Sequence, residues 1–307
     1  MVSPSTDDAA GRPLVGIALV VAATLAFGVS DILTKHLSTL YPVPVVMAVR
    51  YLANLLLLAV FLWPGLGARL WQAQRLWLVI VRGLSLAAAS LTLGWALRLM
   101  PVGETVAIIY LAPFAVMALS VPLLGERVSS IGWAGAAIGF LGVLLIVRPG
   151  GSLDPLGVGI ALVNAALATA YHLLTRLLSR TETTVSMLFH SSWVGALIFC
   201  ILAVPDLPGF APSPIDIGLM LALGCLMTLG HYLFTAAYRQ APASLLAPVN
   251  YLHLVWSSGL GWLVFGHAPE GLSLLGIVLV ALAGAGIAVH AHLRQRSSSA
   301  AAAAEAA

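Results

Sequence analysis

Ionisable side chains lie inside long apolar stretches of this sequence, where a charge is costly and is therefore a candidate for function. Asp31 and Lys35 are four residues apart with the acid first, which is the favourable order for an ion pair on a helix. Arg50 lies about seven residues, or ~10 Å of helix, into the next apolar stretch. It can attract a carboxylate or phosphate of a ligand, or it can neutralise Asp31. His172 changes charge near neutral pH, although a lone histidine and an acid–base pair can both be purely structural.

Uncharged polar and aromatic residues gather in the same stretches, most densely near residue 250. Asn250, His253 and Ser257 follow one another at spacings of three and four residues, so a helix places them on one face. That face is either buried by interhelical hydrogen bonds or lines a ligand cavity. The candidate substrate-binding residues are Asp31, Arg50, Ser90, Trp95, Tyr110, Asn164, His172, His231, Asn250, Tyr251, His253 and Trp256.

No motif for catalysis, nucleotide binding or metal binding accompanies these residues. The sequence contains no Gly-x-x-x-x-Gly-Lys phosphate loop, no His-Glu-x-x-His metal motif and no Gly-x-Ser-x-Gly nucleophile motif. Its two cysteines, Cys200 and Cys225, lie singly within apolar stretches. We therefore expect no catalytic residue, no metal site and no cofactor. Glu104 is interpreted as a helix cap or an interfacial charge.

The chain that must position the candidate residues has 307 residues, of which 61% are hydrophobic and only 8% are charged. Soluble domains contain about 25% charged residues, because they need a polar exterior. The mean hydropathy of +1.03 agrees with this comparison. These values exclude a water-soluble enzyme, a nucleic-acid-binding protein and a disordered chain. We predict an all-α integral membrane protein whose surroundings are the lipid bilayer.

Ten apolar stretches are long enough to cross a bilayer as helices, which takes about 20 residues each. They cover approximately residues 14–35, 43–63, 77–97, 105–124, 130–147, 156–178, 184–204, 215–238, 243–265 and 272–292. The first stretch is long enough to remain in the membrane rather than to serve as a cleaved signal peptide. The remaining residues form short connections, a tail over residues 1–13 and a Ser/Ala-rich tail over residues 293–307, which we expect to be disordered.

The basic residues indicate how the spans are oriented. If the N-terminus is cytoplasmic, ten arginines fall on the inner side and four basic residues on the outer side. Positive residues accumulate on the cytoplasmic side of membrane proteins. We therefore predict that both termini are cytoplasmic and that the protein lies in the inner (plasma) membrane.

The two halves of the chain align at a constant shift of 141 residues. Matched pairs are Arg98 and Arg239, Pro101 and Pro242, and Tyr110 and Tyr251. The same shift relates Asp31 to His172, a titratable pair that suits proton coupling. Each half contains five spans, which is an odd number, so the second half must enter the membrane from the opposite face. The sequence thus predicts two inverted repeats, 14–150 and 151–292, as in many secondary transporters.

These halves also resemble the EamA-type repeats of the drug/metabolite transporter superfamily. The resemblance rests on Pro113, Pro122-Leu-Leu-Gly-Glu-Arg127, the glycines 132, 135, 139 and 142, and, in the second half, Gly266-His-Ala-Pro-Glu270 with Gly276 and Gly284. Ser30-Asp31-Ile-Leu-Thr-Lys35, Arg50 and Arg82-Gly83-Leu84 further resemble the branch with S-adenosylmethionine and riboflavin carriers. The resemblance implies ten helices, alternating access and a small organic solute.

Residues and resemblance together predict a secondary transporter that moves an amino-acid-like, nucleoside- or cofactor-like, or amphipathic solute. Its expected partners are the solute, the bilayer and protons as a coupling ion, with no nucleic acid, and the chain is expected to act as a monomer or homodimer. The alternative is a membrane-embedded enzyme acting on a lipid or isoprenoid. That enzyme would need a catalytic cluster near the membrane surface, whereas the polar residues here lie within the spans.

Overall fold

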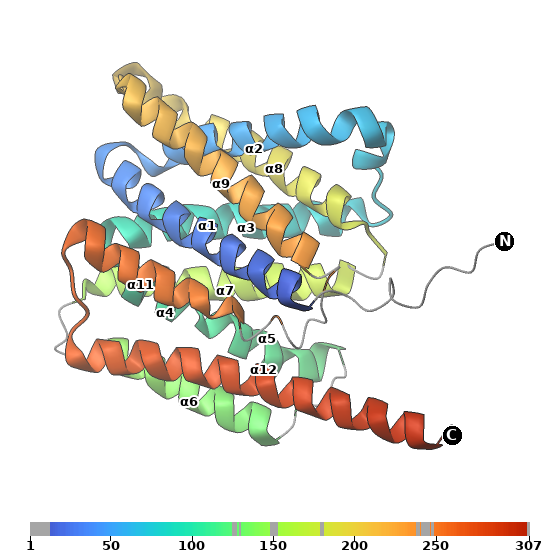
Figure 1. Cartoon of the computed structure of the whole chain (residues 1–307). Helices are drawn as coiled ribbons and strands as arrows, with labels where there is room; N and C mark the ends of the chain where they lie inside the picture. The colour runs from blue at the N-terminus through green and yellow to red at the C-terminus, as the bar shows by residue number, and fades with distance from the viewer. Residues whose placement is uncertain are drawn as a thin grey trace.

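The computed structural model describes residues 13–124, 128, 130–147, 153–178, 181–237, 240, 246 and 249–305, and the regular secondary structure in these ranges is helical (Figure 1). In the first half the helices are α1 (Pro13–Leu40), α2 (Val43–Leu66), α3 (Leu76–Leu99), α4 (Val102–Ile109), α5 (Leu111–Leu124) and α6 (Ser130–Val147). In the second half they are α7 (Pro155–Leu178), α8 (Thr184–Ala203), α9 (Pro214–Ala237), α11 (Leu252–Phe265) and α12 (Gly271–Glu305). Two 3-10 turns, Gly67–Leu70 and Val204–Gly209, follow α2 and α8.

The helix boundaries follow from proline and glycine in the sequence. Pro155 and Pro214 begin α7 and α9, because the fixed backbone of proline suits the first turn and its missing N–H would be unpaired there anyway. Gly266 adopts the left-handed conformation (φ 72°) that ends α11. Pro113 cannot donate to the carbonyl of Ile109, and α4 ends at that residue.

Among the residues that the structure describes, eight helical stretches are long and apolar enough to cross a membrane. The ninth and tenth expected spans correspond to two shorter apolar helices within the described chain, Leu252–Phe265 and Gly271–Ile287. The expected span over 105–124 starts earlier and is broken at Tyr110 into α4 and α5. α12 continues to Glu305, so the tail that we expected to be disordered is helical up to that residue.

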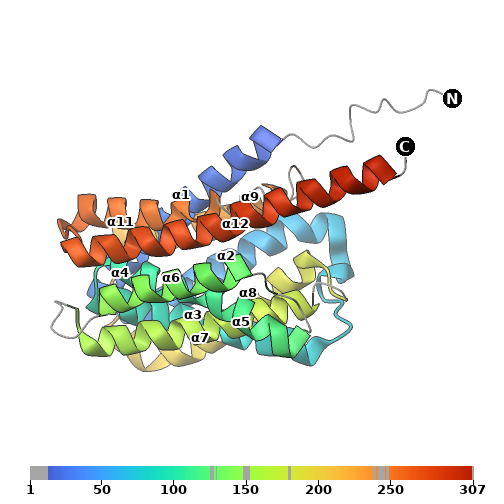
Figure 2. The same cartoon turned by 90° about the horizontal axis from the view of Figure 1, so that it is seen from below.

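The packing of the helices repeats across the two halves. α1 packs against α9 as α7 packs against α3, and α2 packs against α9 as α8 packs against α3. Two pairs join equivalent helices, namely α2 with α8 and α6 with α12, and the latter pair lies along one edge of the bundle in Figure 1 and faces the viewer in Figure 2. On α6, a Cβ added to Gly142 would lie 2.8 Å from the carbonyl oxygen of Gly276 on α12, so the two backbones are in close contact.

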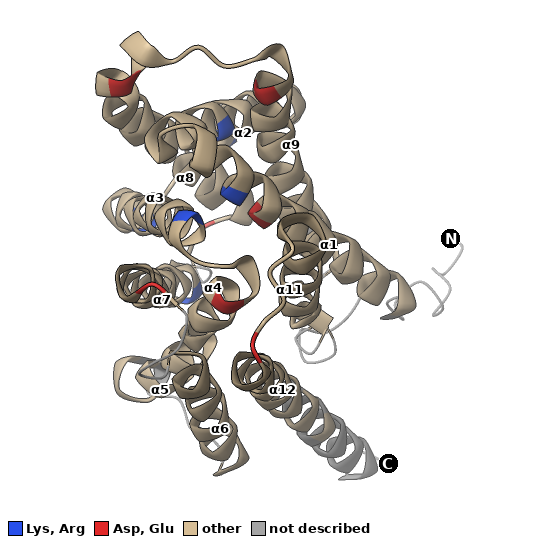
Figure 3. Cartoon of the chain, turned by 90° about the vertical axis from the view of Figure 1, so that its left-hand side faces the viewer, with Lys and Arg blue, Asp and Glu red and all other residues tan. Residues whose placement is uncertain are grey.

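Corresponding helices run in opposite directions. Lys35, near the end of α1, reaches the carbonyl oxygens of Leu97 and Met100 at the end of α3, and Gly157, near the start of α7, packs against Met100. We call the side where α1 ends and α7 begins face A, and the opposite side face B. Face A is seen end-on in Figure 3, where α4 lies between α7 and α11.

The start of α9 also lies at face A. There the hydroxyl of Tyr41, which follows α1, donates to Asp216 Oδ2 in the first turn of α9 (2.7 Å). This hydrogen bond raises the pKa of Tyr41. Because α3 ends and α9 begins at the same face, these two equivalent helices are antiparallel as well.

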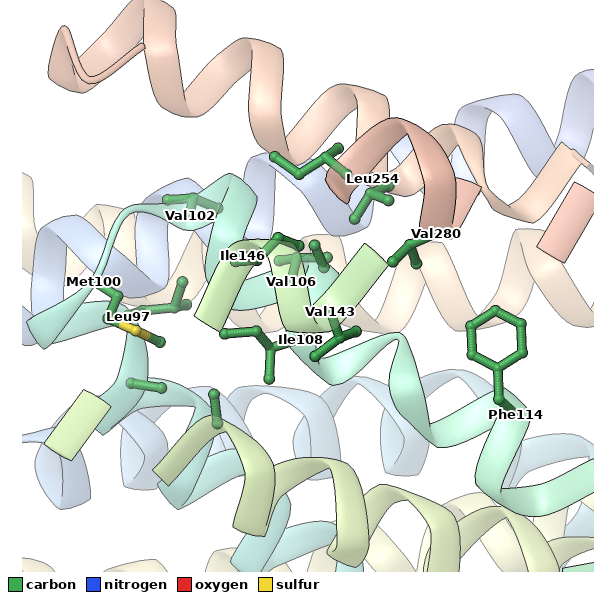
Figure 4. Close-up of a cluster of buried hydrophobic side chains, with 14 of the residues drawn as sticks. Leu97, Met100, Val102, Val106, Ile108, Phe114, Val143, Ile146, Leu254 and Val280 are labelled. Carbon is green, nitrogen blue, oxygen red and sulfur yellow. The ribbon is translucent and has the colours of Figure 1, made fainter. Parts of the chain in front are cut away.

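The largest apolar core joins both halves at the face A side of the bundle. Leu97 and Met100 from α3 meet α4, α5 and α6, and Leu254 from α11 and Val280 from α12 close the cluster (Figure 4). The core holds α4 and α5 in place, and these two helices flank the interruption of the helix at Tyr110.

Candidate functional site

Asp31 connects the two halves in the middle of the bundle. Its Oδ2 accepts a hydrogen bond from Ser257 Oγ (2.8 Å) and lies 2.9 Å from His253 Nε2, both on α11. The hydroxyl of Tyr110, at the break between α4 and α5, lies 3.2 Å from His253 Nδ1 and 3.2 Å from the carbonyl oxygen of Asn250. Asp31, His253, Ser257 and Tyr110 therefore form one chain of polar contacts, which we call the Asp31 cluster.

Aromatic rings surround the Asp31 cluster. Tyr110 packs against its repeat mate Tyr251 with ring centroids 5.3 Å apart, so the two halves meet at equivalent residues. Phe27 on α1 contacts His253 and also His231 on α9, with centroids 6.0 and 5.1 Å apart. These contacts bring five of the candidate side chains predicted from sequence to one place: Asp31, Tyr110, His231, Tyr251 and His253.

Trp256 precedes Ser257 of this cluster on α11 and lies where α11 contacts α1. A Cβ added to Gly28 would lie 2.8 Å from the Trp256 Cβ, so Gly28 allows the two helices to touch. The indole Nε1 is buried and has no hydrogen-bond partner among the described residues. This places one free donor beside the Asp31 cluster.

Arg50 on α2 is buried, with 6% of its surface exposed, and its guanidinium is only partly used. Its Nη1 lies 3.3 Å from Met47 Sδ, and the group stacks over the ring of Tyr51, 5.0 Å from the centroid. Its Nε has no hydrogen-bond partner within the described chain. The recorded partners of Asp31 are on α11 instead. The contacts of Arg50 in the described chain therefore lie on α2, and Asp31 is not among them.

A second buried arginine was not among the candidates predicted from sequence. Arg82 on α3 is 2% exposed and donates to Thr175 Oγ1 (2.7 Å), Tyr171 OH (2.8 Å), Ser191 Oγ (2.8 Å) and the carbonyl oxygen of Met187 (3.0 Å). All four acceptors are uncharged and lie on α7 and α8. The signal for Arg82 in the sequence is a basic residue inside the apolar stretch 77–97.

Ser90 and Asn164 form interhelical hydrogen bonds instead of lying free in a cavity. Ser90 Oγ lies 2.8 Å from the hydroxyl of Tyr51, which joins α3 to α2 beside Arg50. Asn164 Nδ2 on α7 donates to Thr92 Oγ1 (3.0 Å) and to the carbonyl oxygen of Ala89 on α3. Both residues therefore tie helices together.

Trp95 lies on the outer surface of α3. It is 40% exposed and shares its helix face with the exposed residues Trp77, Val81 and Leu84. A tryptophan on this face meets the surroundings of the bundle, so the structure does not bring Trp95 to the other candidates.

His172 lies on the inward-facing side of α7 and is nevertheless exposed. The same side of the helix carries Ala161, Ala165 and Thr169, which are all buried, because these residues recur at spacings of three and four. The inner face of α7 is therefore covered near face A and uncovered toward face B. His172 does not contact its repeat mate Asp31, whose histidine partner is His253.

Lys35 and Glu104 differ from the roles expected of them. Lys35 Nζ donates to the carbonyl oxygens of Leu97 (2.8 Å) and Met100 (2.6 Å), so it ties α1 to the end of α3. Glu104 in the first turn of α4 is 4% exposed, which corrects its interpretation as an interfacial charge. The sequence could not show this, because a cap at a helix start and a buried acid have the same position in the chain.

Comparison with known proteins gives these residues a family context. The description "EamA-like transporter family" matches residues 14–148 and 155–289, once in each half. The chain belongs to this family. It therefore contains two EamA repeats, as the resemblance in the sequence predicted, and it is a multi-span membrane transporter of small solutes.

Curated relatives over most of the chain are named as transporters. The pseudopaline exporter CntI of Pseudomonas aeruginosa is 27% identical over 87% of this chain and 93% of its own length. The riboflavin transporter of Rhizobium johnstonii is 30% identical (88% and 89%), and the S-adenosylmethionine uptake transporter of Rickettsia felis is 25% identical (89% and 92%). A protein of known crystal structure shares the fold, with a TM-score of 0.63 at 21% identity over 95% of this chain and 99% of its own. Membership of this EamA family argues against the alternative of a membrane enzyme.

Proposed function

We propose that this EamA-family protein is a secondary transporter that moves a small organic solute with an anionic group across the inner membrane by alternating access. An amino-acid-like or cofactor-like solute fits best, since the named relatives carry pseudopaline, riboflavin or S-adenosylmethionine. The observation that carries the proposal is Arg50, a buried cation with an unpartnered Nε. A buried charge without a fixed counter-ion is costly, and a bound anion would relieve that cost.

Ten spans in two inverted repeats are the architecture we propose for this transport. Support comes from the antiparallel course of α1 and α7 and of α3 and α9, and from the equivalent pairs α2–α8 and α6–α12. The two shorter apolar helices complete the proposed count of ten. Inverted repeats can exchange their two conformations, so that a site between them opens to each side in turn.

The packing at the two faces supports one conformation of such a cycle. α1 packs against α3 near face A, whereas the repeat-related pair, α7 and α9, makes no contact of comparable extent in the parts that the structure describes. Val102 and Gly261 also close α4 against α11 at face A, where a Cβ on Gly261 would lie 3.1 Å from the Val102 Cβ. The exposed inner side of α7 at His172 fits an opening toward face B. We propose that this conformation is closed at face A.

We further propose that face B is cytoplasmic and that protons drive the transport. The sequence asymmetry of ten to four basic residues supports the orientation. The Asp31–His253 pair supports the choice of ion, because a histidine 2.9 Å from a carboxylate can take up a proton and remain paired.

Arg50 provides the test of the anionic solute. Membrane vesicles with and without the protein are compared for the metabolites that they exchange, and riboflavin and S-adenosylmethionine serve as labelled probes. Arg50→Gln removes the charge, and Arg50→Lys keeps the charge but loses the forked geometry. A charge-assisted hydrogen bond is worth about 1.5–3 kcal/mol, so solute affinity should fall about 10- to 100-fold in Arg50→Gln and less in Arg50→Lys.

Arg98→Gln is the matched control, because Arg98 is exposed at the face A end of α3. This variant should exchange the same solutes at the wild-type rate. Wild-type exchange by Arg50→Gln would contradict an anion site at Arg50. Vesicles whose metabolite exchange does not depend on the protein at all would contradict transport itself.

A further inference from the structure

A small cavity at face A separates the helices that close this face. Its volume is about 10 Å³, which is room for one water molecule. Lys35 from α1 and Ser258 and Trp262 from α11 line one side, Glu104 from α4 lines the other, and His267 after α11 completes the wall. α11 packs against α1 and also against α4, so the cavity lies in the α4–α11 interface that closes face A.

Two oxygen atoms in this cavity are buried without hydrogen-bond partners in the described chain. They are Glu104 Oε2 and Ser258 Oγ. Glu104 is 96% buried, and a Cβ added to the neighbouring Gly103 would lie 2.7 Å from Ser258 Oγ, so α4 and α11 touch directly beside the carboxyl. An ionised carboxylate with an unsatisfied oxygen is unfavourable in such a place, whereas a neutral carboxylic acid can use a single water to reach the serine.

The charged surroundings of Glu104 do not cancel its charge completely. The ammonium of Lys35 donates its hydrogen bonds to the carbonyl oxygens of Leu97 and Met100, and its charge still attracts the Glu104 carboxylate. His267 and Glu270 are the other titratable groups that act on Glu104, and Glu270 repels a second negative charge. Burial therefore favours the neutral form while face A is closed, and water would favour the ionised form once α1 and α11 move away from α3 and α4.

We propose that Glu104 is a proton-binding site whose occupation stabilises the conformation closed at face A. The inference rests on the proposed alternating-access cycle and adds the group that couples this cycle to pH. With the proton bound, the carboxylic acid is buried against α11. Opening of face A hydrates the carboxyl, which releases its proton to the solution on that side. A low pH at face A therefore holds this face closed.

The test measures the distance across face A without any solute. Cys200 and Cys225 are replaced by serine, and spin labels are attached to cysteines introduced at Leu40 and Leu99, which are exposed at the ends of α1 and α3. Pulsed electron paramagnetic resonance then gives the distance distribution at pH 5.5 and pH 8.5, values chosen about one to two pH units either side of neutrality. In the wild type the short distance should dominate at the lower pH and a longer one should gain population at the higher pH.

Three variants assign this pH dependence. Glu104→Gln mimics the protonated acid, so its short distance should persist at both pH values. Ser258→Ala removes the water-mediated partner of the acid, so its transition should shift to lower pH. His267→Gln is the matched control, because His267 lines the same cavity, and this variant should keep a distance distribution that depends on pH.

Several results would overturn the assignment. A wild-type distribution that shows two distances but no dependence on pH would leave alternating access intact and remove the proton site. A pH response that survives in Glu104→Gln, or that disappears in His267→Gln, would assign the proton to another group. One distance under every condition, including added vesicle metabolite extract, would contradict the transport cycle itself as well as this inference.

Discussion

Replacement of Arg82 by methionine tests whether this buried cation is a structural tie. The guanidinium donates four hydrogen bonds, each worth about 0.6 kcal/mol between membrane helices, or about 2.4 kcal/mol altogether. A central arginine in a membrane helix costs about 2.5–3.5 kcal/mol. The lost hydrogen bonds and the removed cost of the charge nearly cancel. Thr175 and Ser191 do not become unpaired in the variant, because each hydroxyl still donates to a backbone carbonyl. We therefore expect the free energy of unfolding of Arg82→Met to lie within about 1 kcal/mol of the wild type.

Arg82→Lys should be less stable than Arg82→Met, because lysine keeps the cost of the charge and has only three donors for four acceptors. Reversible unfolding by sodium dodecyl sulfate in mixed micelles, followed by circular dichroism, gives the three free energies. Ser85→Ala is the control on the same helix, since the Ser85 hydroxyl bonds only to its own helix at Val81. A loss above about 3 kcal/mol in Arg82→Met would refute this balance of bonding against charge burial.

Three further outcomes are expected. Asp31→Asn removes the charge of this side chain and keeps an oxygen that can accept the same hydrogen bonds. The variant should fold but exchange solute about tenfold more slowly in vesicles. A wild-type rate would make the Asp31 contacts purely structural. Gly142→Leu overpacks the α6–α12 contact and should lower the free energy of unfolding by about 1–3 kcal/mol in the same micelles. Gly159→Leu is the control and should leave this free energy unchanged, because a Cβ at Gly159 would meet no atom within 4 Å. Single cysteines are introduced at Ser213 or Ser298 in a chain without its native cysteines. An impermeant reagent should label these two positions from opposite sides of the membrane. Labelling of both from one side would contradict the proposed span count.

Helix positions could be predicted from the sequence because each apolar stretch is bounded by residues that interrupt helices. α2 begins at Val43 and α6 covers 130–147, as the apolar stretches indicated. The break at Tyr110 had a visible signal in Pro113, three residues later, but a length criterion of about 20 residues treats 105–124 as one span.

The inward faces of the helices were much harder to predict. In a soluble protein the buried side of a helix is apolar and the other side polar, but lipid is as apolar as a protein core. Trp95 and Ser90 lie on the same helix, and only the packing of α2 and α7 against α3 shows that Ser90 is buried and Trp95 exposed. The partner of Asp31 was missed for the same reason, since His253 lies 222 residues away on a face that the apolar pattern does not mark.

The duplication repeats the backbone but not the charges, and this difference bears on the direction of transport. At the shift of 141 residues, Arg50 corresponds to Ser191, and Ser191 is one of the residues that bind Arg82. Within the described chain, the two buried arginines thus come from the first repeat, one on α2 about 10 Å from face A and one on α3 about 9 Å from face B. An anionic solute would meet a partly unpaired guanidinium on the face A side and a guanidinium with four hydrogen bonds on the face B side. In the proposed cycle the two conformations can therefore differ in their affinity for the same solute, which changes how fast each direction of exchange runs at a given solute concentration.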